Sequence, residues 1–375
     1  MLKGIHLTLL VGPIVVVPVP QIVLDALTDV TVTTTSERAS VFELKFTLSN
    51  KSPLQTIFLL AGGGAPPLLR VILVVTINGT PDVLIDGVMT DHQIAPGQDT
   101  GHSTLTVTGT DLTEVMNHQD FSGFPFPAMP VEARVALLIL KYAVFGIIPL
   151  IVPSALVDVV IPTDRIPRQQ GTDLQYINQL ASDVGYVFYI SPGPVPGANI
   201  AYWGPQIKVG VPQPALNVDM DAHTNVEGIN FRFNNTRKEL PVMFIQNQLT
   251  KIPLPVPVLD ISLLNPPLGL IPPIPTGIRP IEGTAKLSFA QAALLGMARS
   301  SDSSDAVTGN GTLDVLRYGR VLKARQLVGV RGVGMAFDGL YYVKSVTHSI
   351  KRGEYKQSFE LTRNGLVSIT PRVPA

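Results

Sequence analysis

The 375-residue chain contains no cysteine and one tryptophan, and charged residues make up only 15% of it. The absence of cysteine excludes disulfides, thiolate nucleophiles and zinc sites with cysteine ligands, and it fits a reducing cytoplasm. An ordinary soluble domain has about 25% charged residues. Because the 28 basic residues equal the 28 acidic ones, no net field attracts nucleic acid or anionic lipid.

Apolar residues take the place of the missing charges. Hydrophobic residues make up 45% of the chain, which also contains 33 prolines. This much apolar surface has to be hidden either in cores or against other chains. On a prior of roughly one domain per 150 residues, the length predicts two or three domains.

Two apolar segments imitate membrane signals. Residues 1–25 contain three prolines and lack a small-residue cleavage site, so we interpret them as an apolar extension and not as a signal peptide. The stretch 133–161 is long enough to span a bilayer, but a lysine, two prolines and an aspartate interrupt it. We predict a buried helix from Val131 to about Tyr142, a strand near Leu156 to Ile161, and no stable membrane insertion.

The sequence GTDLQYINQLASDVGYVFYI, residues 171–190, predicts a capped helix followed directly by a strand. Thr172 and Gln175 have the spacing of a capping box, and Gly185 stands where a left-handed residue ends a helix. The aromatic and β-branched residues from Tyr186 to Ile190 favour a strand. This unit is well specified and contains no reactive group.

The remaining pattern is mainly β. From Val30 to Gly109 the chain alternates apolar and polar residues, and Asn78-Gly79 and Asp86-Gly87 are dipeptides typical of hairpins. A second β region begins at Leu216, is interrupted by a proline-rich stretch and a helix, and returns to β from Thr312 to Thr362.

The two β regions share a short motif, His-x-Ile-x-x-Gly, followed by a serine-initiated alternating strand that ends at a glycine. The motifs begin at His92 and His348, and the strands run from Ser103 to Gly109 and from Ser358 to Gly365. Self-similarity of this kind indicates a duplicated unit. The residues therefore predict two related β-domains in one chain.

No set of residues predicts catalysis. A paired role for His92 and His348 is possible, but one histidine in each copy of a duplicated hairpin is better explained as structure. Asp219, Asp221 and His223 form a weak metal-binding pattern without a further cluster. We expect no catalytic, cofactor-binding or metal site and do not expect an enzyme.

The basic residues between positions 317 and 331 are interleaved with valine and leucine and have no stacking aromatics. This pattern predicts a strand and not a nucleic-acid site. We expect them to be solvated or paired at an interface. They are Arg317, Arg320, Lys323, Arg325 and Arg331.

Residues 171–190 together with 338–371 resemble the baseplate hub family of phage tails, the late control gene D group. They are also similar to the hub half of the valine-glycine repeat spike proteins of type VI secretion and of phage-tail-like contractile injection systems. The resemblance covers about Val30 to Pro371. It implies a mainly β, α+β fold with two tube-like β-barrel domains, in which Gly97, Gly185 and Gly353 are scaffold positions.

We predict a division into four parts, in which the first 25 residues and the proline-rich insertion are additions to the pattern of that family. These are an apolar extension (1–25), a first β-barrel domain with a helical appendage (26–165), a helix–strand insert (166–215), and a second β-barrel domain (216–375) that contains a proline-rich insertion (252–280) and a helix (288–299).

The resemblance also implies a function. Three chains would present six barrels to a six-fold inner tube and seat a trimeric spike, in contact with other baseplate proteins. Because the sequence ends at Ala375 without a needle or lysozyme domain, we expect the spike to be a separate polypeptide. The protein would assemble in the bacterial cytoplasm and become part of a phage tail or injection particle. The alternative is a tail-associated enzyme that cleaves peptidoglycan or carbohydrate, which would need a pair of carboxylates in a cleft.

Overall fold

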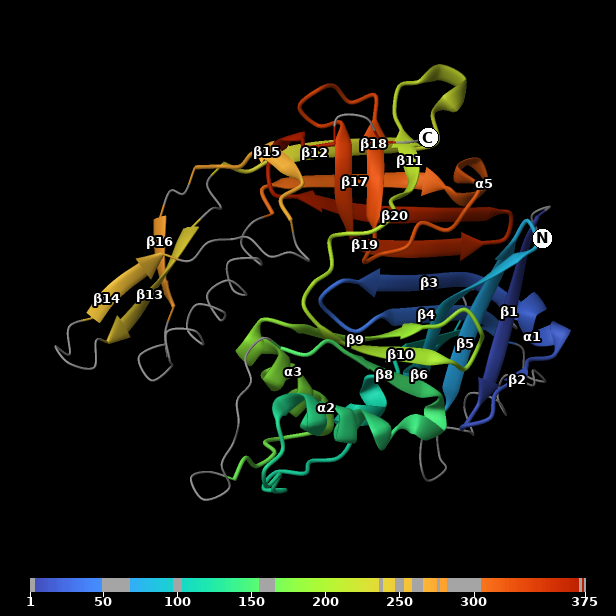
Figure 1. The fold of residues 1–375 in the computed structure, drawn as a ribbon. Helices are drawn as coiled ribbons and strands as arrows, with labels where there is room; N and C mark the ends of the chain where they lie inside the picture. The colour runs from blue at the N-terminus through green and yellow to red at the C-terminus, as the bar shows by residue number, and fades with distance from the viewer. Residues whose placement is uncertain are drawn as a thin grey trace.

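The computed structural model describes residues 4–48, 68–96, 103–154, 166–235, 239–246, 253–257, 266–274, 277–281, 305–370 and 373. The described chain is mainly β, as predicted, with a few short helices (Figure 1). Gly97, the strand near residues 156–161 and the helix at 288–299 lie outside these ranges. None of the helices in the described ranges has the length and apolar character needed to cross a bilayer.

The N-terminal half contributes seven strands to the main sheet. Along the sheet they follow the order β3-β4-β7-β6-β5-β1-β2. Their bounds are β1 (Ile5–Gly12), β2 (Val17–Pro18), β3 (Leu27–Thr35), β4 (Val41–Leu48), β5 (Arg70–Ile77), β6 (Thr80–Pro96) and β7 (Ser103–Asp111). The apolar segment 1–25, expected to be an extension, supplies β1, β2 and most of helix α1 (Gln21–Ala26). It is therefore built into the sheet of this half.

The C-terminal half contributes six strands in the order β12-β17-β20-β19-β18-β11. Their bounds are β11 (Gln213–Asn217), β12 (Gly228–Phe233), β17 (Val307–Asp314), β18 (Leu327–Arg331), β19 (Gly339–Lys351) and β20 (Glu354–Arg363). Strand for strand, this order repeats β3-β4-β7-β6-β5-β1. The two halves differ at one end, because β11 pairs with β18 in parallel whereas β1 pairs with β5 antiparallel.

All thirteen strands belong to one sheet, because β3 of the first half pairs with β19 of the second. Closed barrels were expected, but within the described residues neither half closes on itself. The physical reason is that an edge strand of one half satisfies its backbone groups on the other half. Each half is therefore continued by its neighbour and not sealed by its own last strand.

The shared motif led to the correct hairpins but to the wrong register. Both hairpins, β6–β7 and β19–β20, contain one bulged residue on their first strand, Thr90 and Lys344. His92 lies two residues after its bulge, whereas His348 lies four residues after its own. Counted from the bulge, the position equivalent to His348 is Ile94.

One of the two predicted turns is confirmed and the other is wrong. Asn78 and Gly79 have φ values of 48° and 84° and join β5 to β6, as their sequence predicts. The prediction at Asp86-Gly87 was wrong, because these residues lie within β6, opposite Ile72 and Val71. A buried ion pair, described below, explains the acidic residue there.

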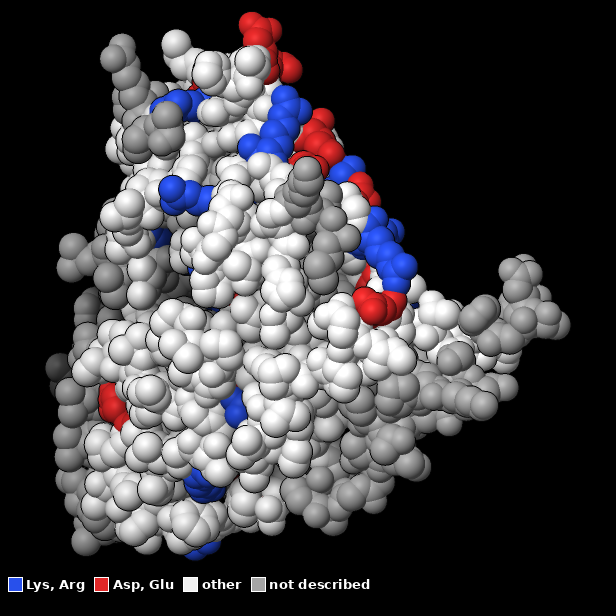
Figure 2. All heavy atoms as spheres, turned by 90° about the vertical axis from the view of Figure 1, so that its right-hand side faces the viewer, with Lys and Arg blue, Asp and Glu red and all other residues white. Residues whose placement is uncertain are grey.

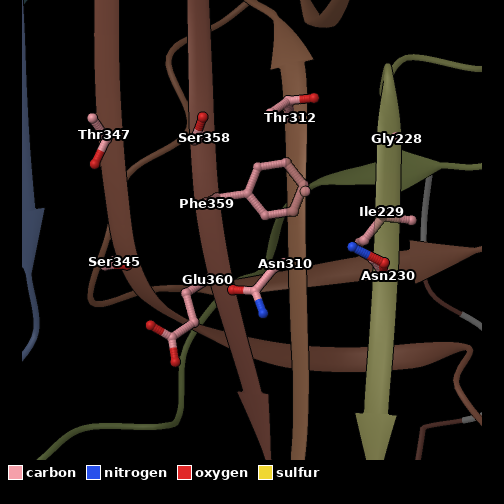
Figure 3. A pocket seen from close by; sticks show the side chains of 11 residues that line it. Gly228, Ile229, Asn230, Asn310, Thr312, Ser345, Thr347, Ser358, Phe359 and Glu360 are labelled. Atoms are coloured by element: carbon pink, nitrogen blue, oxygen red, sulfur yellow. The ribbon is translucent and has the colours of Figure 1, made fainter.

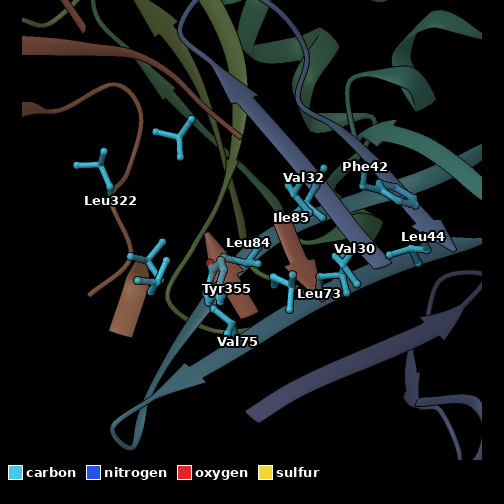
Figure 4. Close-up of a cluster of buried hydrophobic side chains, with 14 of the residues drawn as sticks. Val30, Val32, Phe42, Leu44, Leu73, Val75, Leu84, Ile85, Leu322 and Tyr355 are labelled. Carbon is cyan, nitrogen blue, oxygen red and sulfur yellow. The ribbon is translucent and has the colours of Figure 1, made fainter. Parts of the chain in front are cut away.

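One hydrophobic core joins both halves of the chain. Figure 4 shows side chains of β3, β4, β5 and β6 in the same cluster as Leu322 and Tyr355 of the second half. Val32, Leu44 and Leu73 in this cluster are fully buried. The shared sheet and the shared core together make the two halves one folding unit.

A smaller α+β part packs on the first half and has its own core. Its elements are η3 (Glu114–Asn117), α2 (Val131–Leu140), η4 (Ala143–Phe145), β8 (Ile147–Ile151), α3 (Asp173–Val184), β9 (Val187–Pro192) and β10 (Asn199–Gly204). The predicted capping box is confirmed: the Gln175 backbone N–H donates to the Thr172 hydroxyl, and the Gln175 side chain accepts from the Thr172 N–H. Gly185 has a φ of 68°, so the predicted end of the helix is also confirmed.

Two strands from the proline-rich insertion join β13, which precedes it, in a separate small sheet with the order β14-β13-β16, which stands apart from the body at the left of Figure 1. Its strands are β13 (Glu239–Gln246), β14 (Pro253–Pro257) and β16 (Gly277–Ile281). Both β14 and β16 are edge strands, where proline is tolerated. The remaining elements are β15 (Gly269–Ile271), which pairs with β21 (Leu366–Ser368), the turn η5 (Asp221–His223) and α5 (Val315–Tyr318).

A buried ion pair ties the α+β part to the main sheet. Arg70 of β5 donates two hydrogen bonds to Asp86 of β6, both at 2.7 Å, and a third to the carbonyl of Phe145. Asn199 of β10 donates to the same carboxylate. Only 4% of the Arg70 side chain and 1% of the Asp86 side chain are exposed.

Removal of one partner of this ion pair should cost more stability than removal of both. Arg70→Ala leaves the Asp86 carboxylate buried without its cation, and we expect it to lower the free energy of unfolding by about 3–5 kcal/mol. Urea unfolding of the purified chain measures this. The control is the double variant Arg70→Met with Asp86→Leu, which should lose less. An equal or larger loss in the double variant would contradict the account.

Candidate assembly interface

The junction between the two halves is a stretch of antiparallel β-pairing inside one chain. Residues 29–35 of β3 pair with residues 345–351 of β19 in an unbroken register. On one face of this junction the Thr33 and Thr347 hydroxyl oxygens are 3.0 Å apart. At its end, the ammonium group of Lys351 lies 3.8 Å from the Asp29 carboxylate.

The opposite face of the junction is dry. Val30 and Val32 of β3 are 1% and 0% exposed, and the neighbouring His348 and Ile350 of β19 are 4% and 9% exposed. His348 Nδ1 lies 2.8 Å from the Tyr355 hydroxyl oxygen, with which it shares a hydrogen bond. Because burial disfavours the charged ring, it lowers the pKa of His348 to about 4.

Besides the outer strands β2 and β11, the main sheet leaves two further strand edges without a β-partner among the described residues. In the part of the chain that the structure describes, β12 pairs only with β17, so the backbone groups on its other side have no β-partner there. The end of β6 from Asp91 to Pro96 pairs only with β7, because β5 stops opposite Val88. Such edges have unpaired N–H and C=O groups that can pair with another chain.

One face of the sheet is covered with short polar side chains. Threonine and serine alternate with buried residues along β3, β7 and β19, and continue on β17 and β20. The members are Thr31, Thr33, Thr35, Thr104, Thr106, Thr108, Thr110, Ser345, Thr347, Ser349, Ser358, Thr308 and Thr312. We call this the hydroxyl face.

An open hollow of about 730 Å³ lies on the hydroxyl face over β12, β17, β20 and β19. Figure 3 shows its lining of serine, threonine and asparagine side chains, with Glu360 as the one acid. Its described lining contains neither a second carboxylate nor a histidine, so these residues offer binding groups but no acid–base pair.

Several charged groups on the outside form ion pairs. Lys45 contacts Glu43, and Lys356 contacts both Glu227 and Glu354. Figure 2 shows a side of the molecule that is largely uncharged, with basic and acidic residues interleaved along one margin. No broad field of one sign covers that side.

The residues weighed earlier for chemistry are scattered. Asp221 and His223 lie in the exposed turn η5, whereas His92 lies on β6 and His348 on β19. No group of three or more histidine, aspartate or glutamate residues that could hold a metal occurs in the part of the chain that the structure describes. Gly353 has a φ of 87° in the tight turn between β19 and β20, which favours glycine.

The interpretation of Arg325 as a solvated or interface residue was incomplete. Its guanidinium carbon lies 3.9 Å from the centroid of the Tyr189 ring, so it joins the second half to the α+β part. Desolvation by burial lowers the pKa of Arg325. Lys323, two residues earlier, forms an ion pair of 2.5 Å with Asp82 of β6. No periodicity in the sequence signals either contact, because both depend on segments far apart in the chain.

The junction predicts a dependence of stability on pH. Since the pKa of His348 falls from 6.5 to about 4 on folding, the unfolded chain takes up the proton first. The stability from this site is fully present above pH about 6.5 and is lost as the pH falls toward 4, by about 3 kcal/mol at about 1.4 kcal/mol per pKa unit.

His348→Asn places an oxygen near the Nδ1 position and removes the titration. Urea unfolding at pH 7.5 and at pH 4.5 should show a smaller acid-induced loss in this variant than in the unmodified chain. The difference between the two acid-induced losses gives the contribution of His348, because all other titrating groups are the same in both proteins. An equal loss in both would show that His348 does not titrate as described.

No family model and no curated protein matches the sequence of this chain. Its fold, in contrast, is shared over nearly the full length with solved tail proteins. A tail protein from Neisseria meningitidis MC58 is 14% identical with a TM-score of 0.62, covering 97% of this chain and 98% of its own. A tail protein of prophage MuSo2 from Shewanella oneidensis is 16% identical with a TM-score of 0.63, covering 96% and 99%.

The same fold occurs in a secretion machine. An E. coli component of the type VI secretion system, described as structurally similar to the T4 bacteriophage tail proteins gp27 and gp5, is 11% identical with a TM-score of 0.54. The likeness covers 93% of this chain and 78% of that one. The expected likeness to tail and secretion hub proteins is therefore found at the level of the fold.

Proposed function

We propose that this chain is a structural hub subunit of a contractile tail or injection system. Three copies form a ring that presents six similar β units, and the ring joins a three-fold spike to a six-fold inner tube. The observation that supports this most is the repeated strand order of the two halves within one sheet. Two similar surfaces per chain are what a three-fold ring needs to meet a six-fold partner.

The continuous sheet supports the same proposal. The junction of β3 with β19 holds the two halves side by side in a fixed register, over seven residue pairs. Two loosely tethered domains could not present a regular ring. The fold shared with phage tail proteins and with a type VI secretion component supports the assignment to this class of machine.

The partners follow from this role. A separate spike protein would sit on one face of the ring, the inner tube protein on the other, and further baseplate proteins around it. The small sheet of β13, β14 and β16, which stands apart from the body, is suited to reach a neighbour. Assembly would take place in the bacterial cytoplasm before the ring enters the particle.

The alternative of a cleaving enzyme has less support. Hydrolysis of a glycosidic bond normally uses two carboxyl groups on either side of the bond, about 5–10 Å apart. The hollow on the hydroxyl face has Glu360 as its one acid among eleven lining residues. We therefore propose the hub role alone.

The mass of the native protein tests this proposal. Light scattering should give three times the chain mass of 40.3 kDa for the chain alone, or that mass plus the mass of the bound spike after its spike protein is added. A chain that stays monomeric at high concentration, with and without spike and tube proteins, would contradict the hub role.

A further inference from the structure

The two open strand edges have the same positions in the repeat as the two strands of the internal junction. Strand β12 corresponds to β3, and the end of β6 corresponds to the end of β19. Inside the chain, β3 and β19 already satisfy each other. The equivalent edges of β12 and of the end of β6 have no such partner within the described part of the chain. They lie at opposite ends of the duplicated sheet.

Equivalent residues of the two halves are found by matching the rows of paired residues that lie at the same distance from each bulge. Beside the bulge at Thr90, the row of paired residues runs Val88, Thr110, Val41, Thr33. Beside the bulge at Lys344, the equivalent row runs Tyr342, Thr362, Thr308, Arg232. Arg232 therefore occupies the position of Thr33.

Along the hairpin strands, the same count places Gln93 at the position of Thr347 and Ile94 at that of His348. In the internal junction Thr33 pairs with Thr347. The equivalent pair across the open edges is Arg232 with Gln93.

We propose that β12 of one copy pairs antiparallel with the end of β6 of a second copy, with Arg232 opposite Gln93. In this register Phe233 faces His92, Phe231 faces Ile94 and Ile229 faces Pro96. The contact is head-to-tail, so repetition closes a ring or extends a chain of copies. This inference rests on the proposed hub function and assigns the interface by which its subunits join.

Burial supports the pairing. The apolar face of the internal junction is dry, with Val32 at 0% and His348 at 4% exposure. At the open edges the equivalent residues are less buried: Ile94 is 44% exposed, and Phe231 packs against the core but stays only partly buried. Pairing of the two edges would bury these side chains as their counterparts are buried.

Charge supports the same register. On the polar face Arg232 would lie diagonal to Asp91 of the next copy, within reach of a long side chain. Both residues are exposed, and among the described residues neither forms an ion pair. Opposite charges at the two edges favour this pairing over pairing of β12 with a second β12, which would bring two Arg232 side chains to one interface.

Disulfide trapping tests the interface cleanly because the chain has no cysteine of its own. The two single variants Arg232→Cys and Gln93→Cys are purified, mixed and oxidised mildly. We expect a covalent two-chain product from the mixture and none from either variant alone. In the double variant, oxidation should give covalent products of up to three chains.

The matched control is the internal junction. Thr33→Cys with Thr347→Cys should form a disulfide within one chain, with no increase in mass, because the hydroxyl oxygens there are 3.0 Å apart. Arg232→Cys mixed with Ile94→Cys is the negative control, because these side chains would lie on opposite faces of the paired strands.

A charge exchange gives a second, independent readout. Asp91→Arg alone and Arg232→Asp alone should each weaken self-association by roughly tenfold, and the double variant should recover it. A native trimer that forms no disulfide at positions 93 and 232 and shows no recovery would overturn this interface and leave the hub function standing. A persistent monomer would overturn both. Trapped copies that do not close at three would support the edge pairing and contradict the three-fold ring.

Discussion

The pairing of β3 with β19 is the interaction on which the rest of the structure depends. It joins two similar sets of strands, distant in sequence, into one sheet and fixes their relative position to a single register. A slip of one residue would turn Val30 and Val32 out of the core and Thr31 and Thr33 into it. The pattern of buried valines and exposed threonines therefore specifies the geometry of the whole molecule.

The low charge of the sequence has a structural explanation. One face of the sheet carries mainly threonine, serine and asparagine, with Glu43 and Lys45 among its few charged residues, and the other face is hidden in a core common to both halves. The buried ion pair of Arg70 with Asp86, to which Asn199 donates a hydrogen bond, holds the α+β part against this sheet. Shape is thus maintained mainly by β-pairing and packing, and the buried ion pair of Arg70 with Asp86 lies where the α+β part meets the sheet.

Local features were readable from the sequence, whereas features that depend on distant segments were not. The helix capped by Thr172 and ended by Gly185, and the turn at Asn78-Gly79, are set by neighbouring residues and were predicted correctly. Asp86-Gly87 has the composition of a turn but lies in a strand, because Arg70 on the adjacent strand pairs with Asp86. The duplicated motif identified the related hairpins, but the bulges that set their true register leave no mark in sequence. Continuity of the sheet across the halves also depends on distant pairing, so separate barrels were expected where one sheet is found.

The central claim is that a duplicated sheet adapts three-fold to six-fold symmetry. The most direct measurement is an electron-microscopic average of the assembled ring viewed along its axis. Six similar lobes arranged with three-fold symmetry, two per chain, are the predicted result. A ring with one lobe per chain, or an assembly with two-fold symmetry, would contradict the account.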